Sequence, residues 1–385
     1  MLPALLFSLA FILPAWWVWR RGWRYWAALP LLMCLGLLSL TIAIQLSIVN
    51  RTQAISDTAI LVEELRQPDL FELGDLRNAD RVLFLASSSS KALLAANRTL
   101  LTDPTEVDTT LALLAERVTD RRLFPQWNQR RQWDYHLYFL AHAGAVLVHY
   151  QLATGDTETH AADLRSIGEH LGQRIRRGRY KHLISRPTEE FFRPADNAAA
   201  LYTLAAYDRL AGTSYLPQTY KDWTGYLRNE LYHAESRLPC AAFNASDRCQ
   251  LEPSAVATGL YIAYRAAAAP EQVENDVPWR EWIHYFREGN LSPFTASIRH
   301  NMRDGQPTRF CNQGAAPLEC ERFERAVGLW AAAEYGGEYT YYRLYSSLAF
   351  RRWFGQPEEY TRLSAGQRTT ELTRLALRTT AGWRI

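Results

Sequence analysis

Acidic and aromatic side chains gather directly in front of a helix in the segment RPTEEFFRPADNAAALYTLAAYDRLAG, residues 186–212. Glu189 and Glu190 are followed at once by Phe191 and Phe192. Aromatic neighbours that partly desolvate a carboxyl group raise its pKa, which suits the group to donate a proton. We therefore predict that Glu190 is a catalytic acid and that the other three side chains line a substrate site. A solvated acidic loop is the alternative interpretation.

The helix that follows this loop starts with Asp196 and Asn197. An Asp at this position can cap the helix and complement its dipole. The same carboxylate can exchange protons at the rim of a cavity, with the Asn side chain orienting the substrate. The sequence leaves both roles open, and we predict that Asp196 is catalytic and that Asn197 binds substrate.

A histidine lies within a helical pattern of small and apolar residues. His142 is either a satisfied core residue or a proton carrier, since its ordinary pKa of about 6.5 suits proton transfer. Tyr138 precedes it by four residues and shares its helix face. We predict that His142 is catalytic and that Tyr138 contacts the substrate.

Helical periodicity dominates the chain after residue 50, and few stretches alternate as strands do. Several helical segments end in Gly, and Pro, Asn and Asp cluster between them. The sequence therefore predicts an all-α fold. Similar loops followed by Ala-rich helices favour an α/α toroid over a solenoid, with close-packed inner helices around a central cavity. The clearest helical segments span residues 109–118, 134–155, 160–175, 197–212, 254–269, 324–337 and 341–355.

Two long apolar runs open the chain, at residues 2–19 and 27–49, and each is long enough to cross a bilayer. Three arginines and three aromatic residues lie on the short loop between them, and Trp19 directly precedes it, which marks that loop as cytoplasmic. No basic segment precedes the first run, so a cleaved signal peptide fits poorly. We expect a transmembrane hairpin at 1–50, a link with the first helices at 51–105 and the toroid at 106–385. The soluble body would then face the periplasm from a bacterial inner membrane.

Four of the five cysteines form two C-x8-C pairs, Cys240 with Cys249 and Cys311 with Cys320, while Cys34 lies in the second apolar run. Closely spaced pairs in an oxidising compartment predict two local disulfides. A zinc site is the rival interpretation, but no His stands at a ligand spacing beside either pair. We therefore predict no metal.

Two segments resemble the linalool dehydratase/isomerase family. FFRPADNAAALYTLAAYDRLAGTSY, residues 191–215, is similar to a family segment with an aromatic pair, a Cys-Asn and a helix ending YDRL-x-G-x-x-Y. HAGAVLVHYQLATGD, residues 142–156, is similar to a segment in which a His precedes LYQL-x-TG, and His142 falls on that His. The resemblance runs from about Leu140 to Phe286, with weaker similarity towards the C-terminus. It implies an (α,α)6 barrel.

The family's catalytic cysteine pair is absent. Asp196 stands where the second cysteine would be, and the first would fall near Arg186 or Pro187. The resemblance implies acid/base dehydration, hydration or isomerisation of a small apolar alcohol. Two alternatives stay open: a glycan-active toroid (a glycosidase or polysaccharide lyase), and a non-catalytic subunit of an envelope complex.

The net charge of +3, from 43 basic and 40 acidic residues, gives no reason to expect a nucleic-acid partner. The sequence contains no phosphate-binding loop, dinucleotide fingerprint, HExxH or nucleophile elbow. We expect no cofactor. The expected partners are the lipid bilayer and a small apolar or glycan substrate, and self-association is left open.

Overall fold

The computed structural model of the chain describes two compact units, Met1–Gln53 and Ala54–Ile385. The described residues are 16–17, 20–21, 31, 50–71, 76–99, 103–178, 181–188, 191–244, 246, 248–272, 277–289, 296–299, 302, 320–354 and 365–384. The description covers only the backbone at residues 76–78, 320–322, 347–354 and 365.

Helices make up most of the second unit, so the prediction of an all-α fold is confirmed. Residues 54–65 are helical, and short 3-10 turns lie at Pro68–Phe71, Pro125–Asn128, Arg130–Tyr135 and Pro270–Gln272. Two small antiparallel pairs join β1 (Ala242–Phe243) to β2 (Cys249–Leu251) and β3 (Arg287–Gly289) to β4 (Ala296–Ile298). The longer helices are α3 (Leu76–Asn97), α4 (Pro104–Thr119), α5 (Leu137–Thr154), α6 (Ala161–Arg177), α7 (Pro194–Ala211), α8 (Leu216–Glu230), α9 (Ala255–Ala268), α10 (Val277–Phe286), α11 (Cys320–Tyr335), α12 (Glu338–Phe354) and α13 (Ala365–Arg384).

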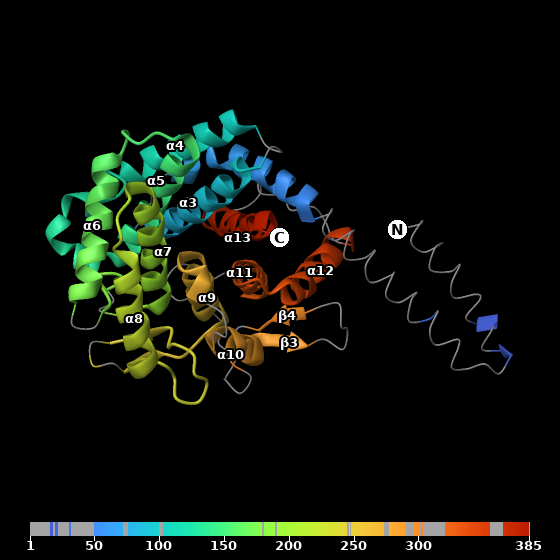
Figure 1. Cartoon of the computed structure of the whole chain (residues 1–385). Helices are drawn as coiled ribbons and strands as arrows, with labels where there is room; N and C mark the ends of the chain where they lie inside the picture. The colour runs from blue at the N-terminus through green and yellow to red at the C-terminus, as the bar shows by residue number, and fades with distance from the viewer. Residues whose placement is uncertain are drawn as a thin grey trace. The chain divides into compact units, whose positions relative to one another are not determined.

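Six helices contact one another in a closed series. The order of contact is α3, α5, α7, α9, α11 and α13, and α13 returns to α3. The helices α4, α6, α8, α10 and α12 pack against members of this series from outside, as Figure 1 shows. We call the closed series the inner ring.

Close packing within the inner ring depends on small side chains. Gly144 of α5 faces Thr203 of α7, and a Cβ atom added at Gly144 would lie 2.7 Å from the Thr203 methyl carbon. The hydroxyl of Thr203 donates to the carbonyl of Ala141 at 2.8 Å, so the two backbones approach closely. Gly155 and Gly212 end α5 and α7 in the left-handed conformation, as the sequence predicts.

Members of the inner ring run parallel. Asp80 near the start of α3 and Asp196 near the start of α7 both pair with Arg186. Lys91 near the end of α3 pairs with Glu334 near the end of α11. Asp196 therefore lies at the positive end of the α7 dipole, whereas Glu334 lies at the negative end of α11 beside the cation of Lys91.

Buried ion pairs join α13 to the helix at 54–65. Arg378 donates from Nε to Asp57 Oδ2 at 2.8 Å, and both side chains are almost fully buried. Trp383 donates to the hydroxyl of Thr58 at 3.1 Å. Because breaking one side of a buried pair leaves an uncompensated charge, loss of either side chain should destabilise this contact.

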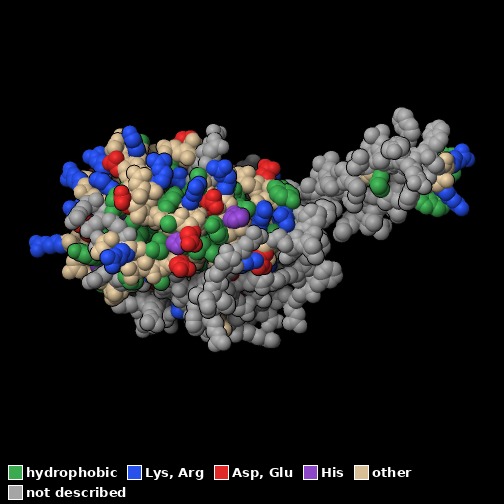
Figure 2. Space-filling model, turned by 90° about the horizontal axis from the view of Figure 1, so that it is seen from below, with side chains coloured by type: hydrophobic (Ala, Val, Ile, Leu, Met, Phe, Trp, Pro, Cys, Tyr) green, Lys and Arg blue, Asp and Glu red, His purple; other side chains and the backbone are tan. Residues whose placement is uncertain are grey.

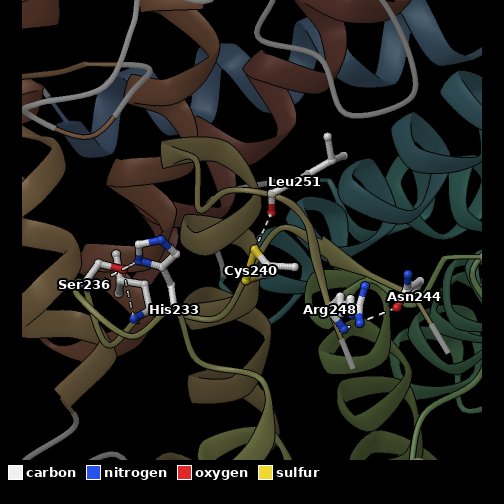
Figure 3. Close-up of a disulfide and its surroundings, with 8 residues drawn as sticks. His233, Ser236, Cys240, Asn244, Arg248 and Leu251 are labelled. Carbon is white, nitrogen blue, oxygen red and sulfur yellow. Dashed lines mark hydrogen bonds between the residues drawn. A yellow bond between two sulfur atoms is a disulfide. The ribbon is translucent and has the colours of Figure 1, made fainter. Parts of the chain in front are cut away.

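The predicted Cys240–Cys249 disulfide is present and closes the hairpin of β1 and β2, which Figure 3 shows beside Asn244, Arg248 and Leu251. The side chain of Asn244 accepts from the backbone of Arg248 and so closes the turn. The second predicted pair, Cys311 with Cys320, lies outside the residues whose side chains are described.

Within the described part of the chain, no helix combines the length and apolar character needed to cross a membrane. The two predicted spans, at 2–19 and 27–49, lie almost entirely outside that part.

Candidate functional site

The loop before α7, residues 181–193, is held by backbone contacts on both sides. Phe192 and Phe243 exchange two backbone hydrogen bonds, of 2.9 and 3.1 Å, and their rings stack with centroids 5.5 Å apart. On the other side the amide of Tyr138 donates to the carbonyl of Ser185 at 3.1 Å. The loop therefore connects the disulfide hairpin to the start of α5.

Asn197 of α7 forms hydrogen bonds to the backbone of the same loop. Its side chain accepts from the amide of Leu183 at 3.1 Å and donates to the carbonyls of Leu183 and Arg193. The side chain is fully buried. These bonds occupy both ends of the amide and give Asn197 a structural role, and its predicted contact with substrate stays a prediction.

Arg186 lies at the centre of a charged group at the start of the inner-ring helices. Its Nε donates to Asp80 of α3 at 2.5 Å, and its Nη1 lies 3.8 Å from Asp196 of α7. Its guanidinium carbon lies 4.0 Å from the centroid of the Tyr138 ring on α5. Burial alone would lower the pKa of Arg186, but the charges of Asp196 and Asp80 outweigh it and raise that pKa. We call Arg186, Asp80, Asp196 and Tyr138 the Arg186 cluster.

The cluster is partly open to solvent. The side chain of Asp80 is 24% exposed, and those of Arg186 and Asp196 are each 13% exposed. Its charged members are one guanidinium and two carboxylates.

His142 lies beneath the Arg186 cluster. Its ring centroid is 4.5 Å from that of Tyr138, which confirms that the two share a helix face. Its Nδ1 is 2.9 Å from the hydroxyl of Ser87 on α3. Burial lowers the pKa of His142 to about 3, and the charge of Arg186 adds to this shift. The imidazole is therefore neutral near pH 7, which corrects the expectation of an ordinary pKa suited to proton transfer.

A second buried group lies towards the other end of the inner ring. Lys91 pairs with Glu334 at 2.9 Å, and its ammonium lies 4.1 Å from the ring centroid of Tyr202. Tyr202 contacts His149 through a hydrogen bond of 2.7 Å. Tyr264 joins the two groups, since its ring lies 5.9 Å from that of Tyr202 and 6.1 Å from that of His142.

The predicted acids of the loop, Glu189 and Glu190, lie outside the described residues. Of the aromatic pair, Phe191 is half-buried, whereas Phe192 is buried against Phe243 and the ring of His182. The Phe192 ring thus contributes to the hairpin contact. Asp196 lies in the first turn of α7 as predicted, but the N-cap residue is Arg193.

Sequence reasoning missed Asp80 and Ser87. Both lie on α3, and Arg186 follows Asp80 by 106 residues, so only the tertiary structure joins them. The signal that existed was the position of Arg186 itself, near the place where the resembled family has its first cysteine.

No group of three or more potential ligands for a metal ion occurs among the described residues. On the face of the molecule in Figure 2, acidic side chains are interspersed with basic ones over the described surface. No family model matches the chain, and no curated protein matches it either.

Proposed function

We propose that the inner ring and its outer helices are an (α,α)6 toroid of the linalool dehydratase/isomerase-like type, held at the inner membrane by residues 1–50 with its body in the periplasm. Its activity would be acid/base dehydration, hydration or isomerisation of a small apolar alcohol. The observation that carries this proposal is the contact of Arg186 with Asp196. These residues stand at or near the two positions where the resembled family has its catalytic cysteines.

In this proposal Asp196 is the proton acceptor. Its carboxylate is partly exposed and lies beside a guanidinium that stabilises the negative charge. The imidazole of His142 is neutral because its pKa is about 3, so in this proposal it holds the substrate hydroxyl by a hydrogen bond. Glu190 remains the proposed proton donor.

The substrate class of this proposal rests on the resemblance and on aromatic surface. Phe191 is half-buried and offers an aromatic face beside the Arg186 cluster, where Tyr138 already packs against Arg186. An aromatic face also stabilises positive charge, which develops when a protonated hydroxyl leaves carbon.

A specific observation favours a second candidate, a non-catalytic envelope subunit. The inner ring holds several large side chains that are buried against one another, among them Tyr202, Tyr264 and Trp330. The guanidinium of Arg186 likewise packs against an aromatic ring, that of Tyr138. Side chains that fill the interior of the inner ring can stabilise the fold of a protein that binds no substrate.

Turnover by the purified full chain, reconstituted in lipid nanodiscs, tests the proposal. Allylic and monoterpene alcohols, the matching alkenes and envelope oligosaccharides are incubated separately, and products are separated by gas or liquid chromatography. We expect dehydration or isomerisation of an alcohol, at least 100-fold slower in Asp196→Asn. The matched control Asp222→Asn, whose exposed carboxylate bonds Gln218 on α8, should leave the rate unchanged.

Each other outcome overturns the proposal. New reducing ends in the oligosaccharide would indicate the glycan-active alternative. No turnover of any compound would indicate the non-catalytic subunit, and equal rates in Asp196→Asn and wild type would remove Asp196 from the reaction.

A further inference from the structure

The amine of Lys91 is buried within the inner ring. Its side chain is 8% exposed, and its partner Glu334 is 1% exposed. The ammonium lies 4.1 Å from the ring centroid of Tyr202 and 5.0 Å from that of Trp330. The Nε1 of Trp330 donates to the same Glu334 oxygen at 2.9 Å.

Lysine is rare in this chain. Only 3 of its 43 basic residues are Lys, namely Lys91, Lys181 and Lys221. Lys221 is exposed and Lys181 is half-buried, so Lys91 alone among them is buried. A chain that otherwise relies on Arg thus has an amine at this interior position. An amine differs from a guanidinium in being able to lose its proton and act as a nucleophile.

The carboxylate of Glu334 contacts a second cation. Its other oxygen pairs with Arg384 at 2.8 Å. Glu334 therefore lies between the buried Lys91 and the half-exposed Arg384, within reach of the amine nitrogen.

A hydrogen-bonded relay lies beside the amine. The hydroxyl of Tyr202 contacts His149 Nε2 at 2.7 Å, and His149 Nδ1 contacts the hydroxyl of Ser90 at 2.8 Å. Arg384, whose side chain is 47% exposed, connects the group with solvent at the end of α13. The surroundings therefore provide a proton acceptor at Glu334, a relay and apolar aromatic walls.

We propose that Lys91 forms an imine with a small apolar aldehyde or ketone. Glu334 takes one proton from the ammonium, and the amine nitrogen bonds to the carbonyl carbon. The carbonyl oxygen receives that proton and, with a second proton from the nitrogen, leaves as water. The product is a protonated imine, so the net reaction converts ammonium and carbonyl into iminium and water. This inference does not depend on the alcohol chemistry proposed for the Arg186 cluster.

Reductive trapping tests the inference on the full chain in nanodiscs. The protein is incubated near pH 7 with 3-methylbut-2-enal and sodium cyanoborohydride, and the alkylated lysines are quantified by peptide mass spectrometry. We expect Lys91 to be alkylated at least tenfold faster than Lys221. The variant Glu334→Gln should slow alkylation of Lys91 at least tenfold and leave that of Lys221 unchanged.

Two results would overturn the inference. One is alkylation of Lys221 and Lys181 ahead of Lys91 in the wild-type protein, a readout that needs no variant and is unaffected if a variant misfolds. The other is an unchanged rate at Lys91 in Glu334→Gln, provided that its circular dichroism matches wild type. The absence of alcohol turnover would leave both readouts intact, so the two proposals fail separately.

Discussion

Acid should destabilise the body of this protein through His142, which the fold holds in its neutral form. Burial and Arg186 lower the pKa of His142 to about 3, whereas an unfolded chain returns it to about 6.5. Between these values the unfolded state binds the extra proton, so stability is full above about pH 6.5 and falls as the pH drops towards 3.

The size of the effect follows from the difference between the two pKa values. From pH 8 to pH 5 the loss from His142 alone is about 2 kcal/mol, at roughly 1.4 kcal/mol for each pH unit below 6.5. For a body of this size that corresponds to a drop in Tm of roughly 3 °C. The window ends at pH 5 because most carboxylates begin to protonate below it.

Scanning fluorimetry of the full chain from pH 8 to pH 5 measures this slope. The variant His142→Gln removes the titrating group, so its Tm should fall by roughly 3 °C less than that of wild type over the window, whatever its Tm at pH 8. The exposed His284 provides the matched control, and His284→Gln should reproduce the wild-type slope. Identical slopes in His142→Gln and wild type would refute the assignment of a neutral, buried imidazole.

Three further changes test the packing that supports the site. Replacing Cys240 and Cys249 by Ser should lower the free energy of unfolding by about 2–3 kcal/mol, measured by denaturant titration, and an equal midpoint would contradict a stabilising disulfide. Gly168→Ala should cost about 1–3 kcal/mol in the same assay, because the new Cβ would lie 2.5 Å from the Tyr207 ring; a neutral effect would mean that the ring moves freely. Asn197→Ala should lower the free energy of unfolding by about 2–3 kcal/mol and speed amide hydrogen exchange in residues 181–193. Unchanged exchange there would show that Asn197 does not hold this loop against α7.

Much of the helical content could be predicted from apolar periodicity, but two members of the inner ring could not. The helix α3 contains the run Ser87–Ser90 and α13 is rich in Thr, and both residue types are poor helix formers. In the structure the hydroxyls of Thr373, Thr379 and Thr380 donate to carbonyls four residues earlier. Tertiary burial and local hydrogen bonds thus outweigh the low helix propensity of Ser and Thr, on which the sequence-based prediction depended.

The contacts of the site also differ in whether the sequence could predict them. The pairing of Tyr138 with His142 followed from a spacing of four residues within one helix, and it is confirmed. The pairing of Arg186 with Asp80 joins residues 106 positions apart and left no local signal. The expected pKa of His142 was wrong for a related reason, since a pattern of small residues indicates burial but not the nearby guanidinium.

The closure of the inner ring sets an order of events during biosynthesis. Arg378 of α13 must reach Asp57, which leaves the ribosome 321 residues earlier. Until then the face of α3 that α13 covers has no native partner, and such exposed surface promotes aggregation. Loss of that helix by a premature stop codon would leave the ring open.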